Sequence, residues 1–534
     1  MLDLKTLDTQ TLQAMEPAAM VDVVTRLLSE LSAQSRQIEQ HQQATQRYER
    51  EIKFKDAKLE KVTFELARLK AWKFGAHTER LNAQQRQMFE DTAAEDEAAL
   101  QAQLDALQGQ ASPAANTDKP KRTPRRQKLP EHLRRIEHRH EPANTTCGCG
   151  QAMERVGEDI SERLDIIPAE FFVHRHVRGK WACRCCQTLV QEPVAPQIVD
   201  KGQPTAGLVA HTLVSRFVDH VPYYRQEQIN ARSGVHTPRS TLASWAGAGG
   251  AALEPLYQAL RQFVLKAPVL HADETPVAML DPGAGKTKKA YVWAYATGAF
   301  DPIPAVVYDF APGRAARHAA EFLGRWSGTL TCDDYAGYGP ALKLHKRIEA
   351  GCLAHARRKF DELAKAGAST VATQALQRMA MLYRIEQEVA TASSAQRLQA
   401  RQQRSVPLWK ELHAWLCQQR ALVPDGGGIA VAIDYSLRRW DALGRFLHDG
   451  NVAIDNNHIE NLMRPWAMGR KAWLFAGSEL AGQRAAMVMS LVQSARLNGH
   501  EPWTYLKNVL ERLLEHPNSR IDELLPHRWT PAAV

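Results

Sequence analysis

Apolar residues recur every seven positions between residues 20 and 72 of this chain, and no Pro or Gly interrupts them. The repeat consists of Val24, Leu31, Ile38, Thr45, Ile52, Leu59 and Leu66. A sustained seven-residue repeat predicts a long helix that pairs with a second helix in a coiled coil, and therefore at least a homodimer. The alternative interpretation is an amphipathic helix that packs on its own protein.

After Gly250 the pattern changes to short apolar runs, which are typical of buried β-strands. Three such runs precede a helical segment, and two more follow with helices between and after them. The expected strands are residues 268–273, 290–295, 305–309, 328–333 and 347–352. Residues 366–440 then show helical spacing. We therefore expect a multidomain α+β protein, with an α/β core that contains a helical insertion.

Acidic residues close two of the predicted strands. Asp273 and Asp333 each end an apolar run, and Glu460 lies far downstream in a predicted helix. Carboxylates are the oxygen ligands that Mg²⁺ prefers, and three of them on separate elements suit two divalent metals over a phosphodiester. The neighbours Glu274 and Asp334 remain alternatives, because successive residues of a strand face opposite sides. Taken singly, each acid could instead cap a turn or pair with a nearby cation.

Basic residues accompany these acids. Four of them, His355, Arg357, Arg358 and Lys359, begin a predicted helix after the fifth strand, and three, Arg464, Arg470 and Lys471, surround Glu460. The candidates for DNA contact among them are Arg357, Arg358, Lys359, Arg470 and Lys471. Cations around a carboxylate cluster suit a nucleic-acid substrate, so we expect these side chains to contact phosphates. A solvated helix face is the alternative.

Five of the eight cysteines lie between residues 147 and 186. Cys147 and Cys149 form one close group, and Cys183, Cys185 and Cys186 form the other, with strand-like residues between them. Two thiolate pairs joined by a hairpin predict tetrahedral zinc, with either Cys185 or Cys186 as the fourth ligand. Four unmetallated core cysteines are the alternative. Nearby histidines that could substitute as ligands are His138, His140, His174 and His176. A site with four protein ligands has no open position, so the zinc should stabilise the fold.

Residues 205–248 have a helical pattern with one break at residues 233–236, where Gly234 supplies backbone freedom. Thr237 is the expected N-cap of the helix after this turn, and Pro238 its first residue. That helix should bury Leu242 and Trp245 and present Arg239, Ser240, Ala243 and Ser244. The layout is typical of a helix-turn-helix that places its second helix in the DNA major groove. Two helices of an ordinary core are the alternative.

Residues 119–135 are rich in Lys and Arg and are interrupted by prolines, which disfavour a helix. We expect a basic arm in which Arg125 and Arg126 lie along phosphates, or else a solvated linker. The whole chain has 534 residues, a formal charge of +9 and a pI near 9.1, which suits a polyanionic partner. No apolar run approaches the roughly 18 residues that span a bilayer. We therefore expect a cytoplasmic, nucleoid-associated protein.

Taken together, these segments resemble the transposases of the IS66 insertion-sequence family, which are DDE (Asp-Asp-Glu) recombinases. The resemblance extends over nearly the whole chain and is densest in residues 454–478. It implies that Asp273, Asp333 and Glu460 hold two Mg²⁺ or Mn²⁺ ions. It also implies an RNase H-like core, in which the strands bearing the two aspartates are neighbours. Within the zinc module, it favours Cys186 as the fourth ligand.

The resemblance implies a transposase that binds the terminal inverted repeats of its element and target DNA, then cleaves and joins strands. Two small accessory proteins of the same element are expected partners. The alternatives are a DNA-binding regulator without catalytic activity and a structure-selective RNase H-like nuclease. The expected parts are a coiled coil (1–85), a linker (86–120), a basic arm with the zinc module (121–195), a helix-turn-helix (196–250), a catalytic domain (251–480, insertion about 366–440) and a helical tail (481–534).

Overall fold

The computed structural model describes residues 129–531, apart from residues 168–169, 200–201, 282–285, 366–368 and 474, together with single positions and short stretches between residues 21 and 104. The chain divides into two compact units. One contains residues 1–67 and 104–114, and the other contains residues 68–103 and 115–534. The first unit includes most of the predicted coiled coil.

Every described position between residues 21 and 66 is helical. The helical positions of the seven-residue repeat are Ile38, Thr45, Ile52, Leu59 and Leu66. Ile38 and Ile52 are 56% and 58% exposed, as in a coiled-coil seam without its partner helix, whereas Leu66 of the same repeat is 5% exposed. Self-association stays a prediction. Four residues named in the sequence analysis lie outside the described residues: Val24, Leu31, Arg125 and Arg126.

The segment 86–120 differs from the expected solvated linker at two described positions. Ala99 and Leu100 are helical and each is 1% exposed. The expectation is therefore wrong at these positions, because burial removes their apolar surface from water.

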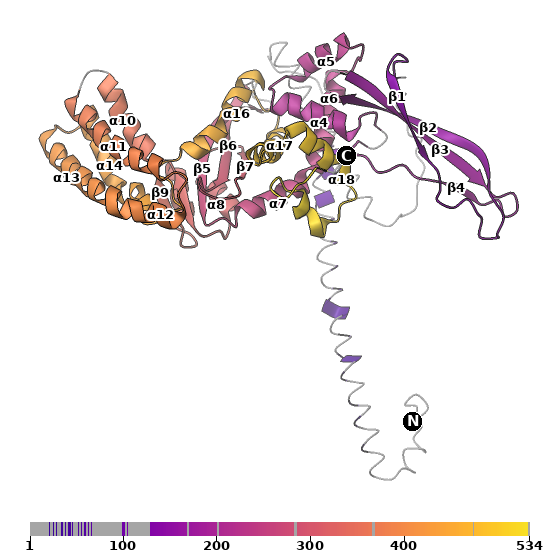
Figure 1. Ribbon diagram of the computed structural model, residues 1–534, viewed down its shortest axis with the longest axis horizontal. Helices are drawn as coiled ribbons and strands as arrows, with labels where there is room; N and C mark the ends of the chain where they lie inside the picture. Colours follow the sequence, from indigo (N-terminus) through magenta and orange to yellow (C-terminus); the bar gives the residue numbers. More distant parts are fainter. Residues whose placement is uncertain are drawn as a thin grey trace. The chain divides into compact units, whose positions relative to one another are not determined.

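A β module follows, whose strands are β1 (Arg134–His140), β2 (Glu154–Ile167), β3 (Glu170–Ala182) and β4 (Leu189–Gln191). The central strand β3 pairs with β2 in an antiparallel hairpin and with β1 in parallel, and its end pairs with β4. Figure 1 shows this module as an extended, twisted ribbon. Phe171, Val173 and Val177 lie on one face of β3 and are buried, and Phe172 on the opposite face is buried as well.

Four helices follow the β module: α4 (Ala206–Phe217), α5 (Tyr223–Arg232), α6 (Arg239–Ala252) and α7 (Glu254–Val264). The break between α5 and α6 lies where the sequence predicts it, and Gly234 has a φ of +76° there. The predicted start of α6 is wrong by one residue, because Pro238 is extended, with a ψ of 142°, and acts as the N-cap in place of Thr237.

The largest sheet contains β5 (Val269–Asp281), β6 (Lys286–Thr297), β7 (Val306–Ala311), β8 (Thr329–Cys332) and β9 (Ile348–Gly351). The strand order is β7-β6-β5-β8-β9, with β7, β6 and β5 antiparallel and β5, β8 and β9 parallel. Helix α8 (Ala316–Leu323) precedes β8, and the short η2 (Ala336–Tyr338) and α9 (Gly339–Leu342) precede β9. All five predicted strands are present. Strand β5 does not end at Asp273, because Val277 and Met279 continue its buried face.

Helix α16 (Asn457–Trp473) and helix α17 (Glu479–Leu497) return to this sheet after the insertion. Ser490 and Ser494 of α17 accept hydrogen bonds from the amides of Tyr308 and Val306 at 2.8 and 3.0 Å, so α17 lies against β7 (Figure 1). Helix α18 (Pro502–Arg512) and η5 (Asn518–Leu524) follow. One hydrophobic cluster includes residues of α4 to α7, the sheet, α16, α17 and α18. The boundaries expected at residues 250 and 480 therefore fall inside a continuous core.

The helices between β9 and α16 build a second hydrophobic core. They are α10 (Leu353–Lys365), α11 (Thr370–Glu388), α12 (Ser394–Ala400), the π-helical turn η3 (Arg401–Ser405), α13 (Val406–Leu422), α14 (Gly428–Arg438), α15 (Trp440–Leu443) and η4 (Arg445–Leu447). Phe360, Met379, Leu412 and Ile433 are buried within this core. The prediction that residues 366–440 are helical is confirmed for the part that the structure describes. Within the described ranges, none of the helices combines the length and the apolar character that crossing a membrane requires.

Candidate metal centres

Adjacent parallel strands position Asp273 and Asp333. Strand β8 pairs with β5 from Val269 to His271, so Asp273 lies just beyond the paired segment. Asp333 directly follows the last residue of β8. Both carboxylates therefore belong to the same edge of the sheet, where one cation could contact them together.

The first turn of α16 is fastened to this edge through Asn456, which is 1% exposed. Its side-chain amide donates to the carbonyl of Ala272 at 2.8 Å and accepts from the ring of His271 at 2.8 Å. Its backbone N–H donates to the sulfur of Cys352 at 3.1 Å. Asn456 thus brings Glu460, one turn later, toward Asp273 despite their separation in sequence.

Among the described residues, the three predicted acids do not form a group whose ligand atoms all lie within 4.8 Å of one another, yet the charges of Asp333 and Glu460 act on Asp273. Burial first, and then the negative charge of Glu274, raise the pKa of Asp273 to about 7, and the charges of Asp333 and Glu460 add to this effect. Repulsion between like charges disfavours ionisation of a carboxyl group, and a divalent cation that binds between the carboxylates removes this repulsion. Oxygen ligands in this state fit Mg²⁺ or Mn²⁺.

The neighbouring acid Glu274 has different partners. Its side chain is 1% exposed and accepts from Arg314 Nε at 2.9 Å and from the Tyr338 hydroxyl at 2.7 Å. The Arg314 guanidinium in turn lies over the Tyr335 ring, 3.6 Å from its centroid. The carboxylate of Glu274 is therefore engaged within the protein.

Asp334, the second alternative, forms an ion pair with Arg439, which also pairs with Glu349 at 2.7 Å. By contrast, the described part of the chain contains no ion pair between a basic side chain and either Asp273 or Asp333. Their side-chain hydrogen bonds are to neighbouring backbone: Asp273 accepts from the Glu274 amide at 2.9 Å, and Asp333 accepts from the Tyr335 amide at 3.0 Å.

Glu460 faces two basic side chains of α10. Its Oε1 lies 3.7 Å from His355 Nδ1, and its Oε2 lies 3.6 Å from Arg358 Nη2. The ligand atoms of Cys352, His355 and Glu460 all lie within 4.8 Å of one another. Cys352 was not predicted as a site residue, and His355 was predicted only as one of the cations near the acids, because the helical insertion separates both residues from Glu460 in the sequence.

The basic residues predicted to bind phosphates have different environments. Arg357, Arg358 and Lys471 are exposed. The ammonium of Lys359 lies over the Tyr435 ring, 4.6 Å from its centroid. Arg470 donates to Thr275 Oγ1 and to the carbonyl of Pro276 at 3.2 and 3.1 Å, and so holds α16 against β5. Contact with phosphates stays a prediction for all five.

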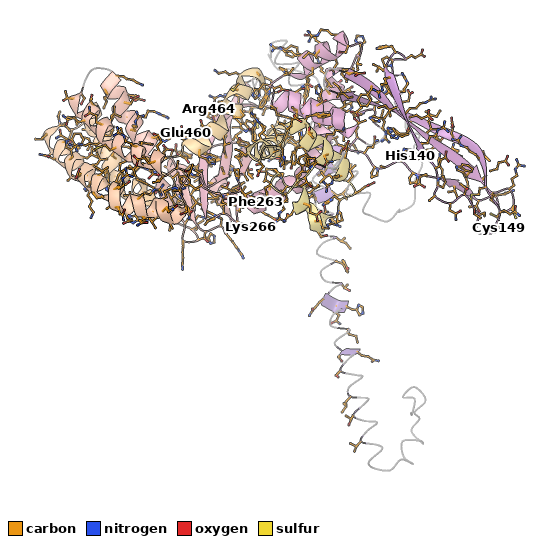
Figure 2. All side chains as sticks on the ribbon, viewed as in Figure 1. His140, Cys149, Phe263, Lys266, Glu460 and Arg464 are labelled. Atoms are coloured by element: carbon orange, nitrogen blue, oxygen red, sulfur yellow. The ribbon has the colours of Figure 1, made fainter. Side chains whose placement is uncertain are left out.

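A cavity of about 660 Å³ opens beside α16. Its polar lining includes Asn461, Arg464, Arg496 and His220, together with the carboxylate of Asp219. Figure 2 shows Glu460 and Arg464 on the same helix, and the lining begins at Asn461, directly after the candidate acid. Its cationic side chains fit a phosphate group.

Only the beginning of α6 is accessible to a partner. Ser240 is exposed, Arg239 and Ser244 are partly exposed, and Ala243 is fully buried, so the prediction that Ala243 faces outward is wrong. The reason is packing: α6 lies against α4 and α5, and a Cβ added at Gly249 would stand 2.7 Å from Val209. A recognition helix reads bases with its N-terminal residues, which is the part left accessible here.

Four cysteines converge at the tip of the β module, where Figure 2 labels Cys149. The sulfurs of Cys147 and Cys186 lie 2.8 Å apart, those of Cys149 and Cys183 lie 3.7 Å apart, and all four lie within 4.8 Å. Tetrahedral zinc with Zn–S bonds of about 2.3 Å places its sulfurs about 3.8 Å apart. Cys185 is exposed and lies outside this group.

The backbone around the cysteines forms two tight turns. Gly150 donates to the carbonyl of Cys147 and has a φ of +85°, and Gln187 donates to the carbonyl of Cys183, each at 2.8 Å. Hydrogen bonds from the Cys147 thiol and from Thr188 lower the pKa of Cys186 to about 6, and the contact with Cys186 helps to raise the pKa of Cys147 to about 12. Four cysteine sulfurs within 4.8 Å fit a structural zinc ion, which displaces the remaining thiol protons on binding.

The four histidines considered as substitute ligands pair with one another instead. His138 and His174 have ring nitrogens 2.7 Å apart, and those of His140 and His176 lie 2.9 Å apart. His174 also contacts the buried Asp165 at 2.8 Å. Within the described residues, none of these histidines joins the cysteine group.

Comparison with known proteins gives matches along most of the chain. The model of the transposase IS66 family matches residues 201–484, and that of the zinc-finger binding domain of transposase IS66 matches residues 144–187. The IS66 C-terminal element matches residues 490–527, and the family described as transposase C of IS166 homeodomain matches residues 61–137.

Three relatives from Sinorhizobium fredii are similar over most of their length. The uncharacterized protein y4qI is 38% identical over 445 residues, which span 81% of this chain and 82% of the relative. The uncharacterized protein y4jD is 36% identical over 415 residues, covering 75% of this chain and 81% of the relative. The uncharacterized protein y4hP is 34% identical, covering 78% of each.

Proposed function

Because this chain belongs to the IS66 transposase family, we propose that it is a DDE transposase that binds the ends of its insertion sequence and cleaves and joins DNA with two divalent metal ions. The strand order supports an RNase H-like core for this activity. Three antiparallel strands, β7, β6 and β5, continue into the parallel strands β8 and β9, which is the order expected for that fold.

The observation that carries the proposal is the placement of Asp273 and Asp333 beyond the paired ends of two neighbouring parallel strands, with the first turn of α16, which bears Glu460, fastened beside them. These acids come from a strand, a strand end and a helix start, and Asn456 fastens the helix to the strand. Two bound Mg²⁺ ions would activate the attacking oxygen and stabilise the leaving oxygen of an in-line displacement. Asp273, Asp333 and Glu460 would hold these ions, while Glu274 and Asp334 are engaged by arginines.

Several surfaces support DNA as the partner. Arg357, Arg358 and Lys471 provide exposed cations near the acids, and the cavity beside α16 adds Arg464 and Arg496. We assign recognition of the terminal inverted repeats to the β module and to the first turns of α6, and self-association to the N-terminal helix. Target DNA would approach the acid cluster in the same complex.

The proposal is tested by replacing the three acids one at a time. Asp273→Asn, Asp333→Asn and Glu460→Gln should each lower Mg²⁺-dependent cleavage of labelled element ends at least about 100-fold, because each removes a metal ligand. Binding of the ends, measured by a gel shift, should remain.

Asp334→Asn is the matched control for these variants. It removes the carboxylate next to Asp333, and cleavage should stay within a few-fold of the unsubstituted protein, since Arg439 engages this residue in an exposed ion pair. Normal strand joining by all three acid variants would refute the assignment.

The same experiment separates two other functions. A DNA-binding regulator without catalytic activity would shift the labelled ends and leave them uncut with Mg²⁺ or Mn²⁺. A structure-selective nuclease would cut branched or hybrid substrates that lack the terminal repeats, with rates independent of the end sequence.

A further inference from the structure

Two buried ligand atoms face each other beside the acid cluster without hydrogen-bond partners. They are Nδ1 of His355 and Oε1 of Glu460, and they lie 3.7 Å apart, which is too far for a hydrogen bond. Leaving a buried polar atom unsatisfied costs about 1–3 kcal/mol, so such a pair calls for an explanation.

A metal ion between these atoms provides that explanation. Zinc bonds of about 2.0–2.2 Å to nitrogen and oxygen place two tetrahedral ligands about 3.3–3.6 Å apart. The observed 3.7 Å is close to this spacing. The sulfur of Cys352 completes a trio whose ligand atoms all lie within 4.8 Å of one another.

The three ligands are held by different elements. Cys352 follows β9, His355 lies in the first turns of α10, and Glu460 lies in the first turn of α16. The Asn456 amide donates to the Cys352 sulfur at 3.1 Å, a contact that stabilises a thiolate. Burial raises the pKa of the Cys352 thiol to about 12, so a metal must displace its proton on binding.

The chemistry of this trio differs from that of the aspartates. Thiolate and imidazole favour zinc and related transition ions, whereas carboxylates alone suit Mg²⁺. Three protein ligands leave one tetrahedral position for water. Both sites need Glu460, whose Oε1 faces the trio and whose charge also acts on Asp273.

We propose that Cys352, His355 and Glu460 form a second transition-metal site that binds Zn²⁺, and that Zn²⁺ bound there holds Glu460 away from the Mg²⁺ ligands and inhibits DNA cleavage. The binding step stands on the geometry of the trio. The inhibition rests on the proposed function, because it requires Glu460 to serve Mg²⁺-dependent chemistry.

Metal binding is tested with Co²⁺ added to the full-length protein that retains one structural zinc per chain, as checked by metal analysis. One additional Co²⁺ should bind with a sulfur-to-cobalt absorption band. Cys352→Ala should abolish this band, and His355→Gln, at a partly exposed position, should weaken Co²⁺ binding at least about 10-fold. Retention of the band and of the affinity in both variants would overturn the site.

Cys417→Ser is the matched control. Cys417 also has a histidine neighbour, His413, with a sulfur–nitrogen distance of 4.0 Å, but it lies exposed on α13 and belongs to no trio of metal ligands among the described residues. The cobalt band should be unchanged in Cys417→Ser. Loss of the band in this variant would place the extra cobalt at Cys417 and refute the proposal.

Inhibition is measured as the ratio of each protein's cleavage rate in Mg²⁺ alone to its rate with added micromolar Zn²⁺. The ratio should be at least about 10 for the unsubstituted protein and should fall toward 1 in His355→Gln. An equal ratio in both would refute the inhibitory role while leaving the binding result standing. If no preparation cleaves DNA in Mg²⁺, the proposed function fails, and the cobalt titration still decides whether the site exists.

Discussion

The cysteine cluster of the β module and the acid cluster of the large sheet are built in opposite ways. The four thiols come from two tight turns, and their sulfurs all lie within 4.8 Å of one another. The acids come from β5, the end of β8 and the start of α16, and they do not form a group of ligand atoms within 4.8 Å of one another. The cysteines therefore fit a closed metal site, and we expect the acids to form an open one.

This difference predicts what each metal does. A closed site contributes its binding free energy to folding, because the unfolded chain does not hold the ligands together. An open site gains its metals only after the surrounding structure has formed. Asn456 and Arg470 fasten α16 to β5 through hydrogen bonds that need no metal. Losing a cysteine ligand should therefore unfold the β module, whereas losing one of the acids should abolish DNA cleavage without unfolding the protein.

The largest expected effect is that of Cys183→Ser. A structural zinc site contributes on the order of 10 kcal/mol, which is comparable to the whole stability of a domain. The variant should lose its zinc, and the β module should become sensitive to limited proteolysis while the helical and sheet core stays resistant. Zinc content and the proteolytic fragments are measured together.

Two controls accompany this variant. Cys185→Ser should keep one zinc per chain, because this cysteine lies outside the group. Asp273→Asn should keep both the zinc and the resistance to proteolysis. If the Cys183→Ser protein kept its zinc and its resistance to proteolysis, the claim that the cysteine site stabilises the β module would be wrong.

A smaller effect separates the acids that hold the structure from those left for metal. Glu274→Gln should lower the free energy of unfolding by about 2–4 kcal/mol, measured in urea. The substitution removes the buried negative charge of Glu274 that pairs with the Arg314 guanidinium. The partial exposure of Arg314 keeps the loss below that of a fully buried pair.

Asp334→Ala is the reference for Glu274→Gln. The Asp334 side chain is 53% exposed, so its pair with Arg439 should contribute less than about 1 kcal/mol. Equal losses of unfolding free energy in the two variants would show that Glu274 has no special supporting role.

Local patterns in the sequence predicted the parts that depend on local geometry. The cysteine turns, the helical insertion and the five strands all follow from spacing and periodicity, and the strands of Asp273 and Asp333 are neighbours, as the family resemblance implied. Packing decided the rest. Strand β5 continues past Asp273 because its hairpin with β6 is long. Ala243 is buried because two other helices pack on α6.

The environment of Glu460 could not be predicted, because it depends on contacts across the helical insertion. Cys352 and His355 precede the insertion and Glu460 follows it, so no spacing rule relates them. Likewise, Arg470 was expected to bind phosphate, whereas its guanidinium contacts Thr275 and Pro276. Side chains that fasten one element to another and side chains that bind DNA are the same residue types.

The smallest expected effect concerns a contribution to the stability of the β module that does not depend on zinc. Burial, followed by the charges of Arg163 and of neighbouring histidines, lowers the pKa of His176 to about 4 from 6.5. Between these values the unfolded chain binds more protons than the folded one at this position, so stability should fall as the pH drops from about 6.5 to 4. The loss should be below about 3 kcal/mol, since His176 is partly exposed.

His176→Gln isolates this contribution from acid release of zinc, which affects both proteins. Unfolding is followed at several pH values with the zinc content measured at each. The stability advantage of the unsubstituted protein over His176→Gln should shrink on acidification across this window. A stability advantage that stays constant would mean that protonation of His176 does not affect the stability of the β module. Release of zinc alone would then make the module acid-sensitive.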